Sequence, residues 1–407
     1  MQDEEQARAG QAGGDAMPPV FAVTRPLEGS GEEAGPRRLE LEFTGSGSEY
    51  FRIWLVNLLL CIVTLGFYLP FARARRLAYF HANTRVGGDP LGFHGNPWKM
   101  LRGYLLMLVF GAAYAVSGRF SPVAAVAAAA VFVLLWPALW RASLQFRLGN
   151  TSWRGLRFGF DGSLGGAYRS MLPAVVPWAG FVSMNWMSRQ ANGEAAAASL
   201  DPRLGWTMGL SFVAFALLMP LALAWTKRYQ HGHYLYAGQR SQLGIGARSF
   251  YLYALKLFGV SLLLFVVQMG ATVAGFTLGA GTRFAPVAFF VAMMTSYAAW
   301  FVILLPFGQS RLQNLVWNAT RSQGVQCRSA LRLWPMVRLT AKNLLLVLLT
   351  VGFYWPFAKV ALARMRLHAM QVDVDAGLEH WQAPAPGSSQ DATGDAAGDF
   401  FGIDLGL

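Results

Sequence analysis

The stretch that decides the fold is NLLLCIVTLGFYLPFA, which runs from Asn57 to Ala72, because the chain carries a close copy of it. Residues 343–358 read NLLLVLLTVGFYWPFA, and eleven of the sixteen positions are identical. In both copies an apolar run is followed by spaced Thr, Gly, Tyr and Pro residues, which are Thr64, Gly66, Tyr68, Pro70, Thr350, Gly352, Tyr354 and Pro356. Similarity between two distant stretches predicts an internal repeat.

The composition is that of a membrane protein. Of 407 residues, 54% are hydrophobic and 14% are charged, and the mean hydropathy is +0.35. A soluble domain carries about a quarter charged residues, so these values exclude an ordinary water-soluble enzyme. The apolar content also excludes disorder along most of the chain. We predict an all-α polytopic membrane protein with small cytoplasmic β-hairpins, internal repeats and six to eight membrane segments.

Apolar segments alternate with basic links. A membrane-spanning helix needs roughly 20 apolar residues, and eight segments reach or approach that length, at about 53–71, 103–118, 122–140, 171–187, 204–226, 257–280, 285–307 and 343–358. Every second link is rich in Lys and Arg, with 6, 5, 5 and 6 of them in 72–102, 141–170, 227–256 and 308–342. Because cytoplasmic loops carry an excess of basic residues, these four links are predicted to be cytoplasmic.

Segments 53–71 and 343–358 leave two topologies open. In the first, each is a re-entrant or half-crossing element, six segments cross, and both tails lie in the cytoplasm. In the second, all eight segments cross and both tails lie outside. The glycine and proline of the repeated motif favour the first topology because they break a helix. Broken helices occur at membrane depth where protein or a wet cavity covers the backbone.

A weaker repeated unit runs through the middle of the chain. We expect each membrane helix to end at a proline and to continue as a short basic helix, after which Asn-Thr opens a β-hairpin turned at Gly and Pro residues. The alternating pattern L-x-F-x-G is predicted to be the return strand. The prolines are Pro70, Pro137, Pro220, Pro306 and Pro356, the first turn is 87–90, and the return strands begin near Leu41, Leu91, Phe158 and Cys327. Link 227–256 fits this unit only with an insertion of about four residues.

The two ends of the chain are acidic. We expect a disordered acidic tail over 1–40, the membrane domain over 41–370 and a flexible acidic tail over 371–407. The net charge is −5 over 1–52, +25 over 53–366 and −7 over 367–407, which sum to +13. Segments rich in small and acidic residues stay solvated. No apolar core of a signal peptide precedes the first hydrophobic segment, so that segment itself is expected to direct insertion.

Several of these motifs resemble a known family. Residues 42–60, running into Thr64–Pro70, strongly resemble the YjgN-like family of bacterial inner-membrane proteins. Residues 75–85 and 93–95 continue the match, and 350–358 is similar to the family's terminal motif. This resemblance covers about 41–370. It implies a multi-pass protein of the bacterial inner membrane, and it implies no activity, because none is established for the family.

The sequence offers no catalytic constellation, and we expect no enzyme, no cofactor and no metal. His231 and His233 form the one close histidine pair, but no carboxylate or Cys lies near them in sequence, and two ligands do not make a metal site. Asp89 and Asp161 adjoin glycines and are expected in turns or caps. There is no phosphate-binding loop or dinucleotide fingerprint. Nucleic acid is not an expected partner, since the basic residues lie next to the membrane segments.

The arginines carry the one functional indication. Arg73, Arg75 and Arg76 follow Pro70, while Arg102, Arg169 and Arg338 recur where the chain enters the next segment. Such residues lie at the depth of lipid phosphates, where each contributes about 1 kcal/mol near an anionic surface. They signal topology and anchor headgroups in the simplest interpretation. In the sharper one, they form a pocket for an anionic lipid or metabolite where the repeats converge.

Two functions are favoured at this point, and a third, a membrane enzyme, has the least support. The first is a transporter or channel for a small or anionic solute, with Thr64, Gly66, Thr350 and Gly352 along its path. The alternative is a non-transporting scaffold or anionic-lipid-binding protein. A polar tunnel between the first and last segments would favour transport, and a sealed core with a basic cytoplasmic face would favour lipid binding. Anionic membrane lipids are the expected partners, and the oligomeric state stays open.

Overall fold

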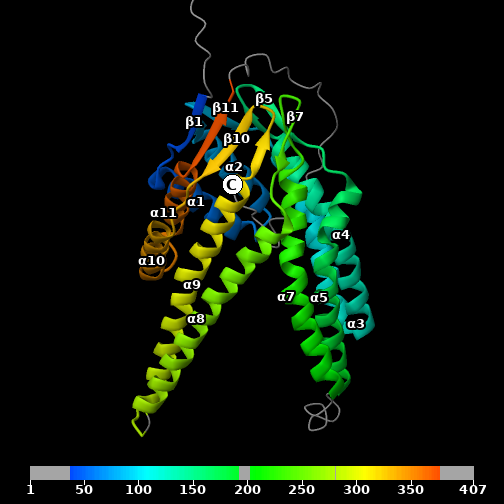
Figure 1. Ribbon diagram of the computed structural model, residues 1–407, viewed down its shortest axis with the longest axis vertical. Coiled ribbons are helices and arrows are strands. Elements are labelled where there is room, and N and C mark those ends of the chain that lie inside the picture. Colours follow the sequence, from blue (N-terminus) through cyan, green and yellow to red (C-terminus); the bar gives the residue numbers. More distant parts are fainter. Residues whose placement is uncertain (1–36, 192–201, 280, 376–407) are drawn as a thin grey trace, which may run out of the picture. The chain divides into compact units, whose positions relative to one another are not determined.

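Long helices joined by short strands make up the structure, a computed structural model that describes residues 37–191, 202–279 and 281–375 (Figure 1). The helices are α1 (Gly47–Val63), α2 (Leu69–Ala82), α3 (Pro97–Phe120), α4 (Pro122–Gly149), α5 (Leu164–Ala191), α7 (Pro202–His231), α8 (Ala247–Gly279), α9 (Ala285–Trp317), α10 (Leu333–Leu349) and α11 (Trp355–His368). The strands are β1 (Arg37–Phe43), β2 (Thr84–Val86), β3 (Asp89–Phe93), β4 (Thr151–Trp153), β5 (Leu156–Phe160), β6 (Tyr234–Tyr236), β7 (Gln239–Arg240), β8 (Gln242–Leu243), β9 (Thr320–Ser322), β10 (Val325–Ser329) and β11 (Met370–Val374).

All of the described strands join one antiparallel sheet in the order β7-β6-β5-β4-β3-β2-β1-β11-β10-β9-β8. Its two end strands, β7 and β8, are separated in the chain by Ser241 alone. Ser241 donates its backbone N–H to the carbonyl of Tyr234 at 2.8 Å, and the Ser322 hydroxyl donates to the carbonyl of Arg240 at 3.0 Å. The sheet is therefore nearly closed into a barrel, here called the β-ring, which leaves no long open edge.

The order strand, helix, helix, strand recurs five times along the described elements. The five sets are β1-α1-α2-β2, β3-α3-α4-β4, β5-α5-α7-β6, β8-α8-α9-β9 and β10-α10-α11-β11. In each set a proline of the second helix precedes the first residue of the following strand by the same interval, in the pairs Pro70/Thr84, Pro137/Thr151, Pro220/Tyr234, Pro306/Thr320 and Pro356/Met370. The spacing between membrane helix and β-ring is thus the same in all five sets.

That spacing corrects the insertion expected in link 227–256. The interval from Pro220 to the start of α8 at Ala247 equals the interval from Pro70 to the start of α3 at Pro97, so no insertion separates the two links. Ser241 and Leu243 take the places that Leu91 and Phe93 hold in the first link. The return strand here is divided into β7, which pairs with β6, and β8, which pairs with β9. Because backbone pairing holds both parts, they form without the L-x-F-x-G side chains.

The expectation that membrane helices end at their prolines is wrong for the three middle ones. Pro137, Pro220 and Pro306 lie inside the continuous helices α4, α7 and α9. A proline inside a membrane helix is tolerated where neighbouring groups satisfy the carbonyl that it frees, and Pro306 is among the most deeply buried residues. At Pro70 and Pro356 the opposite holds, since each lies in the first turn of a new helix.

The predicted β-hairpins are present. In the first, Gly87 and Gly88 have φ of +59° and +92° and connect β2 to β3. Positive φ at both central residues defines the two-residue turn that matches the twist of paired strands. Arg154-Gly155 and Ala237-Gly238 repeat this geometry between the strands that follow α4 and α7.

The duplicated motif reverses the chain and forms two short helical hairpins, α1/α2 and α10/α11. The Thr64 hydroxyl donates to the Leu60 carbonyl at 2.7 Å and accepts from the Tyr68 N–H at 3.0 Å, which ties the end of one helix to the start of the next. Thr350 makes the same two bonds, at 2.7 and 2.9 Å. Gly66 and Gly352 have φ of +90° and +92°, a conformation that favours glycine.

Both ends of each short hairpin lie at the β-ring. Strand β1, which precedes α1, pairs with β2, which follows α2, and β10 likewise pairs with β11 around α10 and α11. Each short helix pair thus leaves the sheet and returns to it, as the three longer pairs also do. The described strands also extend past the domain bounds of 41 and 370 drawn from sequence, because β1 begins at Arg37 and β11 ends at Val374. The remainder of both predicted tails lies outside the described residues.

Five of the described helices are long and apolar enough to cross a membrane. They are α3, α4, α7, α8 and α9. Helix α5 packs along α7, and α8 packs along α9. The helices extend from one side of the β-ring (Figure 1), so the four basic links, which contain β2 to β10, all lie at the same end of the helices.

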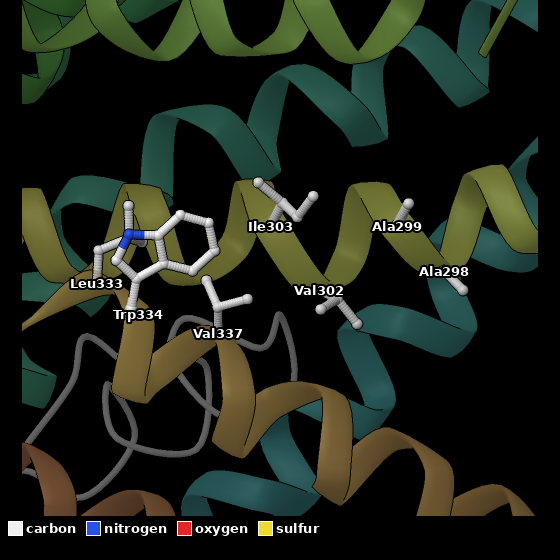
Figure 2. A pocket seen from close by; sticks show the side chains of 7 residues that line it. All are labelled: Ala298, Ala299, Val302, Ile303, Leu333, Trp334 and Val337. Atoms are coloured by element: carbon white, nitrogen blue, oxygen red, sulfur yellow. The ribbon is translucent and has the colours of Figure 1, made fainter. Parts of the chain in front are cut away.

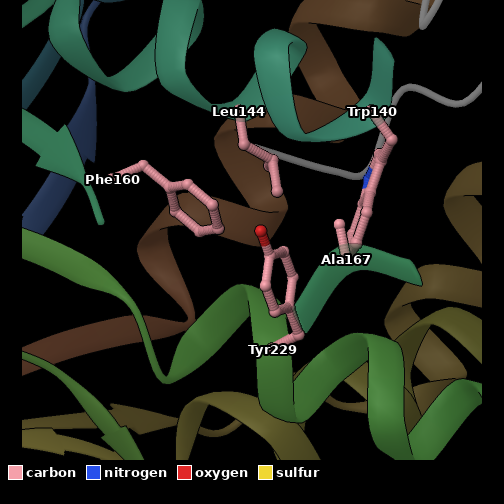
Figure 3. Packing of buried hydrophobic residues seen from close by; sticks show 5 residues of the cluster. All are labelled: Trp140, Leu144, Phe160, Ala167 and Tyr229. Carbon is pink, nitrogen blue, oxygen red and sulfur yellow. The ribbon is translucent and has the colours of Figure 1, made fainter. Parts of the chain in front are cut away.

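Apolar side chains fill the β-ring and seal the joints between successive helix pairs. Leu39 and Val374, on the neighbouring strands β1 and β11, form one buried cluster with Trp153 of β4, and side chains of β6 and β10, Tyr236 and Val325, pack against it. A second cluster lies where α4, α5 and α7 meet below β5 (Figure 3), and it consists of Trp140, Leu144, Phe160, Ala167 and Tyr229. These clusters fix the returning helices to the ring.

The hairpin turn provides a stability test. Val351 has a φ of +49°, and this left-handed conformation costs a residue with a side chain roughly 1–2 kcal/mol. Because Val351 is 87% exposed, Val351→Gly removes the strain with little loss of packing. We expect it to stabilise the purified protein by about 1 kcal/mol in thermal unfolding. Leu345→Gly, within α10, is the control and should destabilise by about 1 kcal/mol. A less stable Val351→Gly variant would contradict the turn geometry.

Candidate functional site

A groove of about 610 Å³ lies beside the hairpin of α1 and α2. Two cationic side chains, Arg52 and Arg75, line it together with an apolar wall and a polar end, which consist of Ile53, Val56, Ala78, Tyr79, Ala82 and Asn83. Arg52 and Arg75 are exposed. The groove therefore combines two cations with an apolar surface, which is the combination that an anionic amphiphile requires.

The start of α1 is fixed by a capping box. The Ser46 hydroxyl accepts from the Glu49 N–H at 3.2 Å, and the Glu49 carboxylate accepts from the Ser46 N–H at 3.4 Å. That backbone bond is the main reason why the pKa of Glu49 lies below its ordinary value. An ionised carboxylate in the first turn also interacts favourably with the positive end of the helix dipole. The first residue of α1 is therefore fixed, and with it the position of Arg52 along the helix.

Tyr79 fixes α2 against that cap. Its hydroxyl donates to the Ser46 carbonyl at 2.9 Å and lies 3.1 Å from the Glu49 carboxylate. Burial, together with the hydrogen bond to Glu49, raises the pKa of Tyr79 to about 12, so the phenol keeps its proton and remains a donor. A Cβ on Gly45 would lie 2.8 Å from both the Phe43 ring and the Tyr79 hydroxyl, which explains the glycine of the L-x-F-x-G pattern here.

Below the two arginines, the apolar wall continues along α1 to the tip of the hairpin. Val56, Ile62 and Val63 are exposed, and Val63 retains 79% of its surface. Arg75 lies at the other end, with its guanidinium carbon 5.7 Å from the centre of the Tyr68 ring. An exposed apolar surface of this kind marks a site of interaction with a membrane or with another protein.

The structure brings together only part of the predicted arginine set. Arg75 lines the groove and Arg73 is buried in α2. Burial raises the pKa of Tyr50, and the positive charge of Arg76 opposes that rise. Arg102, Arg169 and Arg338 are exposed, but each lies on a different helix, at the sixth residue of α3, α5 and α10. They do not line this groove.

Arg52 is the groove residue that the predicted set left out. It is the sixth residue of α1, the place that Arg102, Arg169 and Arg338 hold in their own helices. The signal was present in the sequence, since Arg52 lies eleven residues after Leu41, as Arg102 does after Leu91. What the spacing does not reveal is that α2 returns alongside α1 and places Arg75 on the same groove.

Other residues singled out from sequence have structural partners. His231 bonds to the Thr320 hydroxyl through Nδ1 at 3.1 Å, whereas His233 bonds to the Tyr229 carbonyl at 2.7 Å. Asp89 pairs with Arg154 at 2.6 Å and Asp161 lies 3.6 Å from Arg240, so both connect neighbouring hairpins of the β-ring. Within the described ranges, no group of three His, Cys, Asp or Glu residues has metal-binding geometry.

A second groove, of about 340 Å³, lies between α9 and α10 (Figure 2). Its lining is apolar throughout and consists of Ala298, Ala299, Val302, Ile303, Leu333, Trp334 and Val337. It offers no charged or hydrogen-bonding side chain except the Trp334 indole. Of these two grooves, the α1/α2 groove is therefore the one whose lining includes charged side chains.

Tyr79→Phe tests how the groove is built. The variant loses the hydroxyl that joins α2 to the cap of α1, and we expect a loss of about 1–2 kcal/mol in the free energy of unfolding, measured by thermal denaturation. Tyr50→Phe is the matched control, because Tyr50 belongs to the buried cluster against which Tyr79 packs, and the bonds from α2 to the α1 cap come from Tyr79. Equal losses in both variants would show that the Tyr79 hydroxyl does not hold the two helices together.

Comparison with known proteins shows a family and a small number of relatives. Residues 38–400 match the family described as Bacterial protein of unknown function (DUF898). The protein is 28% identical to Inner membrane protein YjgN of Salmonella typhimurium over 139 residues, which is 33% of this chain and 35% of that protein. It is 34% identical to Inner membrane protein YjgN of Escherichia coli K12 over 129 residues, 30% of this chain and 31% of the relative. The chain thus spans about a third of the curated relatives that it matches. No solved structure matches it.

Proposed function

The chain belongs to the DUF898 family of bacterial proteins of unknown function, and we propose that it binds anionic phospholipid in the inner membrane without transporting a solute. The relatives are named as inner-membrane proteins, and the five long apolar helices suit a multi-pass protein. The observation that carries the proposal is the α1/α2 groove, in which Arg52 and Arg75 lie above an apolar wall.

The proposed topology has six crossing helices and two re-entrant hairpins. The crossing helices are α3, α4, α5, α7, α8 and α9. In α1 the apolar run from Ile53 to Val63 is about 16 Å long, roughly half of the 30 Å hydrocarbon layer. The β-ring, with the basic links in it, faces the cytoplasm by the positive-inside rule. The five strand–helix–helix–strand sets are, in this proposal, copies of one ancestral unit.

The groove lies at the depth where it would meet a lipid headgroup. Arg52 is the last residue before the apolar run of α1, and Arg75 follows the hairpin turn by several residues on α2. A guanidinium presents two parallel N–H donors to a phosphate, so each arginine can hold phosphate oxygens. An acyl chain would lie along Ile53 and Val56 towards the exposed tip.

The transport hypothesis has less support in the geometry. The hydroxyls of Thr64 and Thr350 are engaged in the two hairpin turns. The first and last apolar segments meet through aromatic rings, with Phe51 and Phe357 5.6 Å apart and Trp54 and Phe353 6.2 Å apart. Together with the apolar filling of the β-ring, these contacts support a sealed core. That Thr64, Gly66, Thr350 and Gly352 line a path stays a prediction.

Native mass spectrometry of the purified protein tests the lipid proposal. We expect the wild type to retain phosphatidylglycerol or cardiolipin and Arg52→Gln/Arg75→Gln to bind them about 30-fold more weakly, at roughly 1 kcal/mol for each arginine. The control is Arg85→Gln/Arg157→Gln, which removes the same charge from exposed positions of the β-ring. Equal weakening in both double variants, or no anionic lipid on the wild type, would refute the proposal.

A further inference from the structure

The joint between α9 and α10 differs from two of its counterparts. In the α4/α5 joint the Tyr168 hydroxyl donates to the Leu134 carbonyl at 2.7 Å, and in the α7/α8 joint the Tyr251 hydroxyl donates to the Leu217 carbonyl at 2.7 Å. Each tyrosine is the fifth residue of its helix, and each follows the proline of the preceding helix by 31 residues. A tyrosine thus ties the helix that leaves the ring to the preceding helix at the same height in both joints.

Val337 holds the place of this tyrosine in α10. It is the fifth residue of that helix and follows Pro306 of α9 by 31 residues. Its side chain is smaller than a tyrosine ring and has no hydroxyl for the carbonyl of Ile303, which corresponds to Leu134 and Leu217. The apolar groove of about 340 Å³, here called the α9/α10 groove, has Val337 and Ile303 on its walls (Figure 2). The small side chain in place of a ring accounts for the groove.

The α9/α10 groove opens towards hydrocarbon in the proposed topology. Its α9 wall, residues 298–303, belongs to a run without a charged residue that extends from Ala285 to Ser310. Ile303 precedes Arg311 by eight residues, which is about 12 Å along a helix, and apolar side chains such as Phe301 are exposed on the same stretch of α9. This inference therefore rests on the membrane placement in the proposed function, and it does not require the α1/α2 groove to bind lipid.

Arg338 adds a cation next to the apolar lining. It directly follows Val337 and is exposed, and it lies four residues after Trp334, so the two side chains are neighbours on the helix surface. As the sixth residue of α10 it holds the place that Arg52 holds in α1, where the proposed function puts a lipid phosphate. A guanidinium can hold two oxygens of a phosphate group. A phospholipid bound through Arg338 would therefore have its acyl chains beside the groove.

We propose that the α9/α10 groove binds an acyl chain of a phospholipid whose phosphate lies against Arg338. The chain would lie between the two helices, from Trp334 and Val337 towards Ala298. The apolar lining favours hydrocarbon over a polar solute. A helix of a second copy fits less well, because a helix with its side chains is about 10 Å across and one of its turns occupies about 420 Å³, which exceeds the volume of the groove.

Filling the groove tests the proposal, with native mass spectrometry of the full chain released from phosphatidylglycerol nanodiscs as the measurement. Val337→Tyr gives α10 the residue that its two counterparts have, so we expect the variant to fold with an unchanged or higher Tm and to retain one lipid fewer than the wild type. Ala299→Phe fills the groove from the α9 side and should lose the same lipid. Val291→Tyr adds a tyrosine at an exposed position of α9 outside the groove and should retain the wild-type number.

Two further arms separate this site from the α1/α2 groove and from contact between copies of the chain. In the Arg52→Gln/Arg75→Gln background, Val337→Tyr should still remove one lipid, so failure of the α1/α2 groove leaves this site standing. Arg338→Gln should weaken binding of the same lipid about 5-fold, since an arginine near an anionic surface contributes about 1 kcal/mol. The proposal is refuted if folded Val337→Tyr and Ala299→Phe variants retain as many lipids as the wild type. It is also refuted if filling the groove converts a dimer into a monomer without loss of lipid.

Discussion

Strand pairing around the β-ring is the constraint on which the rest of the structure depends. Each strand is short, with two to seven residues, and an isolated pair of such strands is marginally stable at best. The ring joins all of the described strands in one sheet and pairs β1 with β11, which connects the two ends of the described chain. Because every helix pair begins and ends at a strand of this ring, the ring sets the position, direction and depth of the helices.

The sequence predicts the local parts of this architecture well. The Gly87-Gly88 turn, the return strands ending in Phe43, Phe93 and Phe160, and the chain reversal favoured for the Thr-x-Gly-Phe-Tyr-x-Pro motif all follow from short-range chemistry. The β1–β11 pairing does not, because five or seven residues give no indication of a partner more than 300 positions away. For the same reason the sequence predicts an insertion near Ser241 that the structure does not contain, since the register there depends on the neighbouring strands and not on the side chains of the segment itself.

The candidate sites show the same division. The spacing of Arg52, Arg102, Arg169 and Arg338 is a property of the sequence, and it places one exposed arginine at the sixth residue of each of four helices. Whether a second cationic side chain lies beside one of these arginines depends on the helix that returns to the ring. In the α1/α2 pair, the returning helix α2 places Arg75 in the groove that Arg52 lines.

Closure of the β-ring between its first and last strands is the central claim, and disulfide cross-linking in membranes tests it most directly. Glu40 and Gln371 are paired in register, within the Cα separation that a disulfide bridges. In a background with Cys61→Ser and Cys327→Ser, Glu40→Cys/Gln371→Cys should form an intramolecular bond on mild oxidation and change the gel mobility of the chain. Glu40→Cys/Gln326→Cys, one strand further round, should not. Failure of the first pair to cross-link, while both of its cysteines react with a maleimide, would contradict the closed ring.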